Sequence, residues 1–115
     1  MGEIYIVPTP IGNLGDFTYR SKEILSEVSK IYAEDTRTSK KLLKKYEIET
    51  PIYSYHQHNE HKIVASLINE IKEKKIKIAL ISDAGTPGIS DPGYLLVNKA
   101  KENNIDVFCL PGATS

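Results

Sequence analysis

The sequence predicts an α/β fold in which helices cover both faces of a mainly parallel, five-stranded sheet. Short apolar runs alternate along the 115 residues with longer segments of helical periodicity, in the order βαβαβαβαβ. Such alternation is typical of a parallel sheet with right-handed crossovers. Hydrophobic residues make up 40% of the chain and the mean hydropathy is -0.32, which fits a single folded core.

Five apolar runs predict the strands. The first run stops at Pro8, which has no N–H group to donate to a neighbouring strand. The run that begins at Ile76 is almost continuously apolar, as is typical of a strand buried on both faces. The expected strands are 4–7, 31–33, 51–55, 76–81 and 105–110.

Four segments with apolar residues at helical spacing lie between these runs. The clearest is the third, in which apolar side chains from Ile63 to Ile71 share one face. The fourth begins at Asp91 and Pro92, a capping residue followed by a proline in the first turn. The expected helices are about 17–28, 36–46, 59–75 and 91–104.

Charge, cysteine content and hydropathy exclude several classes of protein. No apolar run approaches the roughly 18 to 20 residues of a membrane span, so no membrane association is expected. The 15 basic and 15 acidic residues exclude a domain that is basic overall, but they leave room for a local basic patch. The single cysteine, Cys109, excludes a disulfide framework and suits the reducing cytoplasm, where we expect the protein to be located.

A polar or glycine-rich cluster follows every predicted strand. In chain order the clusters are TPIGNLGD, EDTRTS, HQHNEH, SDAGTPGISDPG and PGATS, whereas the connections from helix to strand, such as KEKKI, are plain. The carboxyl ends of parallel strands meet at one edge of the sheet, where open α/β sheets bind ligands. The pattern therefore predicts a binding site at this edge.

The fourth cluster is the richest in glycine and proline. Glycine lets a ligand approach the backbone closely, and proline stiffens the turn, so SDAGTPGISDPG is suited to offering N–H groups to a ligand. It matches neither the GxGxxG dinucleotide motif nor a P-loop, because no GK[ST] closes it. An ordinary tight turn between strand and helix is the alternative.

Two clusters carry groups suited to proton transfer. In EDTRTS, Asp35 can act as a base or orient a hydroxyl and Arg37 can hold a phosphate, although helix capping and a local ion pair are the alternative. In HQHNEH, His58 offers an imidazole, the group that suits proton transfer near neutral pH, while Asn59 and Glu60 lie beside it in the sequence. The histidine spacing matches no standard zinc site, so no metal is expected, and a solvated loop is the alternative.

The neutral net charge hides one basic stripe. Arg37, Lys40, Lys41, Lys44 and Lys45 recur on one face of the second predicted helix. A stripe that begins at the edge of the predicted site is what a phosphate backbone would contact, although most such stripes are only solvated helix faces.

The segments VPTPIGNLGD, AEDTRTS, HQHNE, SDAGTPGISDPG and PGATS resemble the small-subunit ribosomal RNA 2′-O-ribose methyltransferase I family. That family belongs to the tetrapyrrole methylase superfamily of S-adenosylmethionine-dependent enzymes. Its members have two α/β domains, hold the cofactor in the cleft between them and are usually homodimers. The resemblance implies that residues 1–115 are the N-terminal domain, that a C-terminal domain is absent from this chain, and that the chain alone is inactive.

The resemblance also implies roles for individual residues. The family's first cofactor loop, usually GxGPGD, reads here PTPIGNLGD, and the segment often written GGDP reads AGTP. These departures favour the ribosomal RNA branch over porphyrin or corrin methylation. The implied cofactor contacts are Ile11, Gly12, Ala84, Gly85, Thr86, Thr114 and Ser115.

The implied reaction is methylation of a cytidine ribose 2′-hydroxyl in 16S rRNA. Asp35, His58 and Glu60 are the candidates for the base or the orienting groups. The candidate RNA contacts are Arg37, Lys40, Lys41, Lys44 and Asn59. Two alternatives stay open: a methyltransferase with a tetrapyrrole or other small-molecule or protein acceptor, and a non-catalytic nucleotide-binding module.

Overall fold

The computed structural model describes residues 2–8, 19–33, 36–55, 60–82 and 91–110. Its sheet contains β1 (Glu3–Pro8), β2 (Lys30–Ala33), β3 (Ile52–Ser54), β4 (Lys77–Ser82) and β5 (Asp106–Cys109). The strands are in the order β3-β2-β4-β1-β5, and every neighbouring pair is parallel. The predicted parallel sheet is confirmed, and each strand bound lies within one residue of that expected.

The described helices are α1 (Tyr19–Glu27), α2 (Thr36–Lys45), α3 (Glu60–Lys74) and α4 (Asp91–Glu102). Each predicted helix is therefore confirmed, and the ends differ by a few residues where the apolar pattern extends into a cap or turn. The expected starts of the first helix at Phe17 and of the third helix at Asn59 lie outside the described residues.

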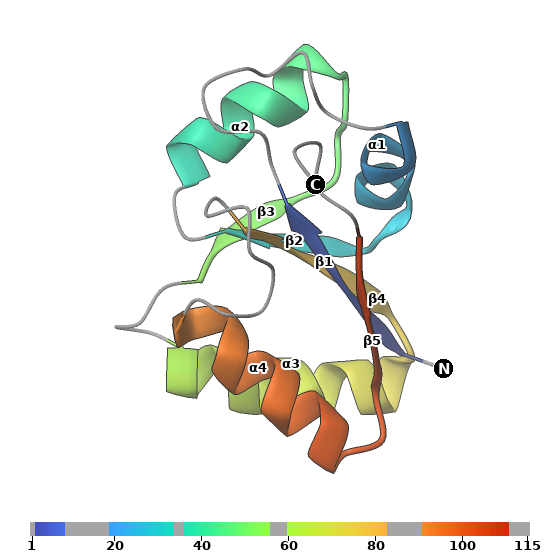
Figure 1. Cartoon of the computed structure of the whole chain (residues 1–115), viewed down its shortest axis with the longest axis vertical. Helices are drawn as coiled ribbons and strands as arrows, with labels where there is room; N and C mark the ends of the chain where they lie inside the picture. The colour runs from blue at the N-terminus through green and yellow to red at the C-terminus, as the bar shows by residue number, and fades with distance from the viewer. Residues whose placement is uncertain (1, 9–18, 34–35, 56–59, 83–90, 111–115) are drawn as a thin grey trace.

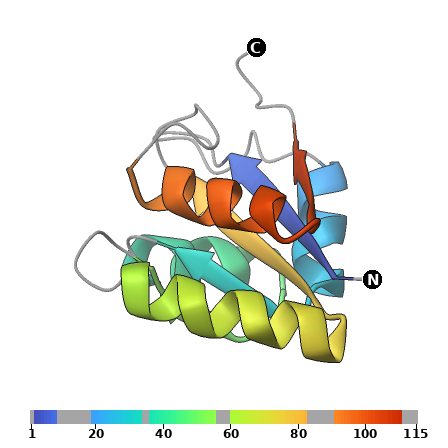
Figure 2. The same ribbon diagram turned by 90° about the horizontal axis from the view of Figure 1, so that it is seen from below.

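The helices form a layer on each face of the sheet, as predicted (Figure 1). Alternation along β1 explains this arrangement: Ile4 and Ile6 join the core beneath α3 and α4, whereas Tyr5 and Val7 join the core beneath α1 and α2. Figure 2 shows α3 and α4 side by side across their face of the sheet. Burial on both sides explains why a strand such as β4 reads as a continuous apolar run.

Three of the described helices are followed, within two residues, by a residue with a left-handed backbone, and none of these residues is glycine. Glu47, Lys75 and Asn104 have φ values of 57°, 55° and 59°. After α2, the amides of Glu47 and Ile48 donate to the carbonyls of Lys44 and Leu43, which is the pattern of a Schellman cap. These caps turn the chain sharply from each helix toward the next strand.

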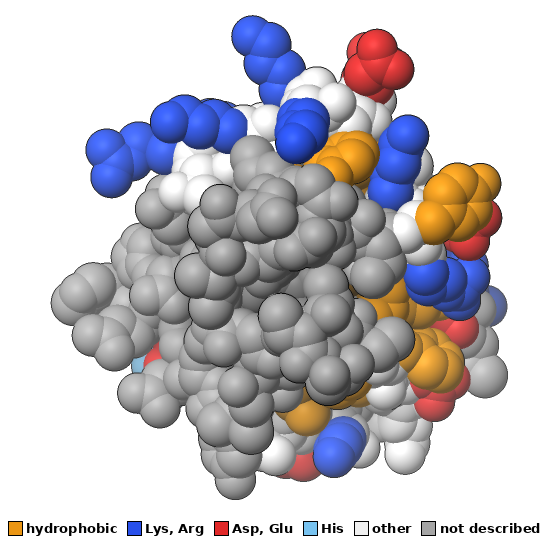
Figure 3. Space-filling view, turned by 45° about the horizontal axis from the view of Figure 1, so that its top comes forward, with side chains coloured by type: hydrophobic (Ala, Val, Ile, Leu, Met, Phe, Trp, Pro, Cys, Tyr) orange, Lys and Arg blue, Asp and Glu red, His pale blue; other side chains and the backbone are white. Residues whose placement is uncertain are grey.

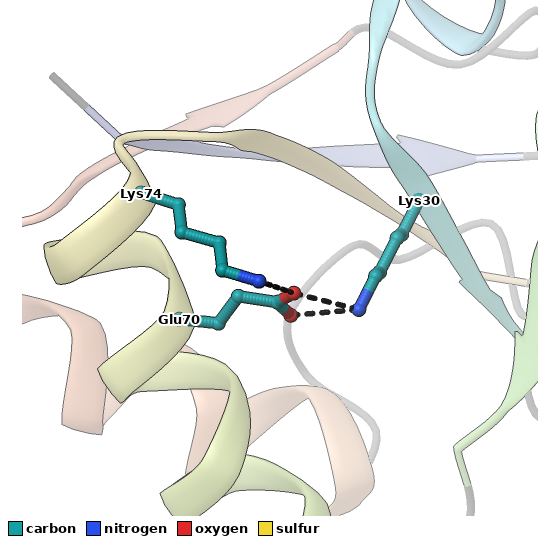
Figure 4. A network of polar contacts seen from close by, with 3 residues as sticks. All are labelled: Lys30, Glu70 and Lys74. Carbon is teal, nitrogen blue, oxygen red and sulfur yellow. Dashed lines mark hydrogen bonds and ion pairs between the residues drawn. The ribbon is translucent and has the colours of Figure 1, made fainter.

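One polar network joins β2 to α3 (Figure 4). The Lys30 Nζ atom lies 2.8 Å from each carboxylate oxygen of Glu70, and the Lys74 Nζ atom lies 3.8 Å from Glu70 Oε2. The hydrogen bond to Glu70 raises the pKa of Lys30. The network thus fixes the amino end of a central strand to the middle of a helix.

Among the described residues, no helix combines the length and the apolar character that a membrane crossing requires.

Candidate functional site

The strand ends that face the predicted site lie level with one another. Pro8 of β1 is opposite Ser82 of β4, and Ala33 of β2 is opposite both Ile81 and Ser54. Since the sheet is parallel, the chain leaves all these strands at the same edge, and the α2, α3 and α4 helices each begin after such an exit. The polar clusters of the sequence follow these strand ends.

The chain passes to opposite faces of the sheet after the neighbouring strands β1 and β4. It reaches α1 after β1 and α4 after β4, and the two helices pack on different cores, represented by Leu25 and Leu96. Where the chain leaves two adjacent parallel strands toward opposite faces, the sheet has a topological switch point. Open α/β sheets form their ligand crevice at such a point. Segments 9–18 and 83–90, which were predicted to contact a ligand, follow these two strands.

The structure describes part of the predicted site. Glu60 is the first residue of α3, and Arg37, Lys40, Lys41 and Lys44 lie on α2. The other predicted site residues lie outside the described residues: Ile11, Gly12, Asp35, His58, Asn59, Ala84, Gly85, Thr86, Thr114 and Ser115. Their assignments stay predictions.

Glu60 offers a buried hydrogen-bond acceptor at this edge. Its Oε2 atom is buried and has no hydrogen-bond partner among the described residues. Tyr55, at the end of β3, is fully buried, and its burial together with the nearby Glu60 charge raises the pKa of its phenol. Because a buried carboxylate oxygen without a partner is costly, the arrangement favours a donor group supplied by a ligand or by another part of the chain.

The basic stripe lies on the exposed face of α2, as the periodicity predicted. Leu42 and Leu43 are buried on the inner face, whereas Lys40, Lys41 and Lys44 are exposed and have no ion pair with a described residue. Figure 3 shows Lys and Arg side chains projecting outward over this helix. The α2 helix contains no acidic residue, so its lysines have no acid on their own helix with which to pair.

Ser39 was not predicted from the sequence as a residue of interest. Its side chain is 2% exposed on the inner face of α2, and its Oγ atom has no hydrogen-bond partner among the described residues. The one available signal was a serine at a position where the helical pattern calls for an apolar residue. Ser39 is therefore a second buried polar group, besides Glu60, whose partner is not among the described residues.

A parallel α/β sheet with a switch point between β1 and β4 places the chain in the doubly wound class of folds, whose members bind ligands at that point. The chain belongs to the Tetrapyrrole (Corrin/Porphyrin) Methylases family, whose model matches residues 3–115. This match confirms the superfamily that the sequence motifs indicated.

Relatives with similar sequences are named ribosomal RNA small subunit methyltransferase I. The chain is 51% identical over 115 residues to the relative from Mycoplasmopsis pulmonis, and the match covers 100% of this chain and 51% of the relative. It is 53% identical over 115 residues to that of Synechocystis sp., covering 100% of this chain and 41% of the relative. The chain therefore spans about half the length of these relatives or less.

Solved structures of low sequence identity share the fold. A cobalt precorrin-4 methyltransferase has a TM-score of 0.77 at 14% identity, over 96% of this chain and 45% of its own. Uroporphyrin-III-C-methyltransferase from Thermus thermophilus has a TM-score of 0.72 at 16% identity, over 96% of this chain and 47% of its own. At this identity the likeness establishes the fold, not the acceptor of the methyl group.

Proposed function

We propose that the chain is the N-terminal α/β domain of an S-adenosylmethionine-dependent enzyme that methylates the 2′-hydroxyl of a cytidine ribose in 16S rRNA. Identity of about 50% to proteins named ribosomal RNA small subunit methyltransferase I supports an rRNA substrate. The observation that carries the proposal is the acid-free basic face of α2, which begins at the sheet edge with the switch point. Such a face suits the phosphates of a nucleic acid better than a small apolar acceptor.

The cofactor is assigned to the crevice at the β1 and β4 strand ends. Ile11 and Gly12 follow β1, while Ala84, Gly85 and Thr86 follow β4, so segments on adjacent strands can converge on one ligand. When bound, S-adenosylmethionine supplies an electrophilic methyl group on its sulfonium. Thr114 and Ser115, beyond β5, complete the proposed contacts.

The protein's own groups orient the acceptor and remove its proton. The ribose 2′-hydroxyl is a weak acid, so a correctly placed acceptor of its proton assists its attack on the methyl group. The unpartnered Glu60 oxygen is suited to this contact, with Asp35 and His58 as the other candidates. Positioning then supplies much of the acceleration, because a hydroxyl held in line with the methyl group needs no further ordering.

The same interpretation assigns the RNA contacts and the assembly. Arg37, Lys40, Lys41 and Lys44 contact phosphates, and Asn59 contacts the substrate nucleotide. A second domain follows the region that corresponds to this chain and closes the cofactor cleft, so the chain by itself is inactive. The complete enzyme is a cytoplasmic homodimer that acts on the small ribosomal subunit.

Single-turnover methyl transfer by the full-length protein tests the proposal. With small ribosomal subunits that lack the modification and radiolabelled S-adenosylmethionine, label is expected on one ribose 2′-oxygen of 16S rRNA. Glu60→Gln is expected to slow transfer by about 100-fold at saturating RNA and cofactor, because the amide cannot take up the proton. Glu73→Gln, which changes an exposed acid further along α3, serves as the matched control and retains the rate.

The outcomes separate the alternatives. Label on a tetrapyrrole or a protein, with none on rRNA, would contradict the proposal that rRNA is the acceptor. The proposal that the protein is a methyltransferase would still stand. Tight binding of ATP or NAD without binding of S-adenosylmethionine would favour a nucleotide-binding module. An unchanged rate for Glu60→Gln, with rRNA still labelled, would remove Glu60 from the reaction and leave Asp35 and His58.

A further inference from the structure

A shallow cleft lies between α2 and β3, outside the edge where methyl transfer is proposed. Its volume is about 700 Å³, which falls within the range of small-ligand sites. Its apolar surface comes mainly from the half-buried Ile52, beside the largely buried Leu43 and Ile48. The remaining lining residues are polar or charged: Lys40, Lys44, Glu47, Glu49 and Thr50.

The end of α2 creates this cleft. The left-handed backbone of Glu47 reverses the chain, and the Ile48 amide donates to the Leu43 carbonyl at 2.9 Å. Thr50 is fixed as well, because its Oγ1 atom donates to the Leu25 carbonyl at 2.7 Å. The cleft is thus walled by a helix and by a loop that hydrogen bonds hold at both ends.

Its two lysines are not neutralised by described residues. Lys40 and Lys44 are exposed and have no ion pair there, whereas Lys30, Lys77 and Lys99 each lie within 4 Å of a carboxylate. Glu47 and Glu49 line the same cleft without pairing with either lysine. The cleft therefore combines free cations for an anion, an apolar surface for a ring, and carboxylates that accept hydrogen bonds.

We propose that this cleft holds one unstacked nucleotide of the RNA, flanking the methylated one. Its phosphate contacts Lys40 and Lys44, its ring packs on Ile52, and an amino group of its base donates to Glu49. The α2 helix rises about 12 Å from Thr36, near the reacting edge of the sheet, to Lys44. The cleft is therefore reached by a neighbouring part of the RNA strand and not by the reacting nucleotide itself. This inference rests on the proposed RNA substrate.

The carboxylate predicts a preference among bases. Cytosine and adenine carry an exocyclic amino group that a carboxylate can accept from, whereas uracil offers a carbonyl oxygen in its place. Binding of single-stranded oligocytidylate and oligouridylate of about six nucleotides to the full-length protein tests this. The wild type is expected to prefer oligocytidylate by about tenfold, and Glu49→Gln to remove most of this preference. Glu73→Gln is the control and retains it.

The lysines predict a change in salt dependence. Each phosphate contact with a single strand contributes about 0.7 to the slope of log K against log salt concentration. Lys44→Gln is expected to reduce the slope by about that amount and to raise the KM for RNA without lowering kcat. Lys101→Gln, which removes an exposed lysine from the last turn of α4, is expected to leave the slope unchanged.

The results distinguish failure of the cleft from failure of the proposed function. If rRNA is methylated but Glu49→Gln keeps the base preference, or the wild type has none, the cleft assignment is wrong and the function stands. Equal slopes for Lys44→Gln and Lys101→Gln would also overturn it. If no rRNA is methylated, the proposed function fails, and the oligonucleotide experiments still report whether the cleft binds RNA.

Discussion

Single residues at the helix ends carry strain that glycine would relieve. Lys75 has a φ of 55°, and its amide donates to the Ile71 carbonyl at 2.9 Å, so the cap forms despite the Cβ atom. The left-handed region costs an L-residue roughly 1–2 kcal/mol, part of which is offset by the greater freedom of glycine in the unfolded chain.

Replacing this lysine is therefore expected to stabilise the chain. Lys75→Gly should raise the free energy of unfolding by about 0.5 kcal/mol, measured by urea denaturation. Glu73→Gly, two residues earlier on the exposed face of α3, should lower it by about 1 kcal/mol, because glycine is unfavourable inside a helix. The same sign for both substitutions would contradict this account of the cap.

Between elements, Glu70 joins a helix to a strand of the sheet. It binds Lys30 of β2 at 2.8 Å and lies 3.8 Å from Lys74 on its own helix, and its side chain is 21% exposed. An ion pair between two flexible surface side chains contributes little, but a partly buried one with two short hydrogen bonds contributes more. The network therefore helps to fix α3 against β2.

Glu70→Gln is expected to lower the free energy of unfolding by about 1 kcal/mol, since the amide loses the charge and one acceptor. It should also lower the pKa of Lys30, because the hydrogen bond that raises this pKa is weakened. Denaturant unfolding measures the first effect and NMR titration of the lysine side chain the second. Glu73→Gln is the control on the same helix. If both variants lost the same free energy of unfolding, the network would not contribute to stability.

For the whole molecule, several groups hold their protons more tightly when folded. Burial, aided by the hydrogen bond to Glu3, raises the pKa of Tyr5 to about 12 from 10.0. Burial also raises the pKa values of Tyr32 and Tyr55, and the Glu70 hydrogen bond raises that of Lys30. Above pH 10 the unfolded chain therefore loses protons that the folded chain retains.

Stability should consequently fall at alkaline pH. The contribution of these groups is complete below about pH 10 and is lost as the pH rises through their folded pKa values. Urea midpoints from about pH 8 to pH 11.5 should be flat at first and then decline. Tyr5→Phe should show a smaller decline, since it removes one of the groups; a decline as steep as in the wild type would exclude Tyr5 as a contributor.

Much of the fold and part of the site were predictable from sequence because they depend on local patterns. The alternation along Ile4–Val7, the helical face from Ile63 to Ile71 and the exposed lysines of α2 follow from the side-chain period of each element. The buried oxygen of Glu60 and the hydroxyl of Ser39 were not predictable in this way, because burial depends on neighbours distant in the chain.

The sequence by itself determined the element order, the parallel sheet and the family, since periodicity and the motifs after each strand are local properties of the chain. Tertiary structure decided the strand order β3-β2-β4-β1-β5. In this order β1 and β4 are adjacent, which creates the switch point. It also decided the cleft between α2 and β3. Pairing between strands far apart in sequence depends on how whole faces fit together, which no local pattern specifies.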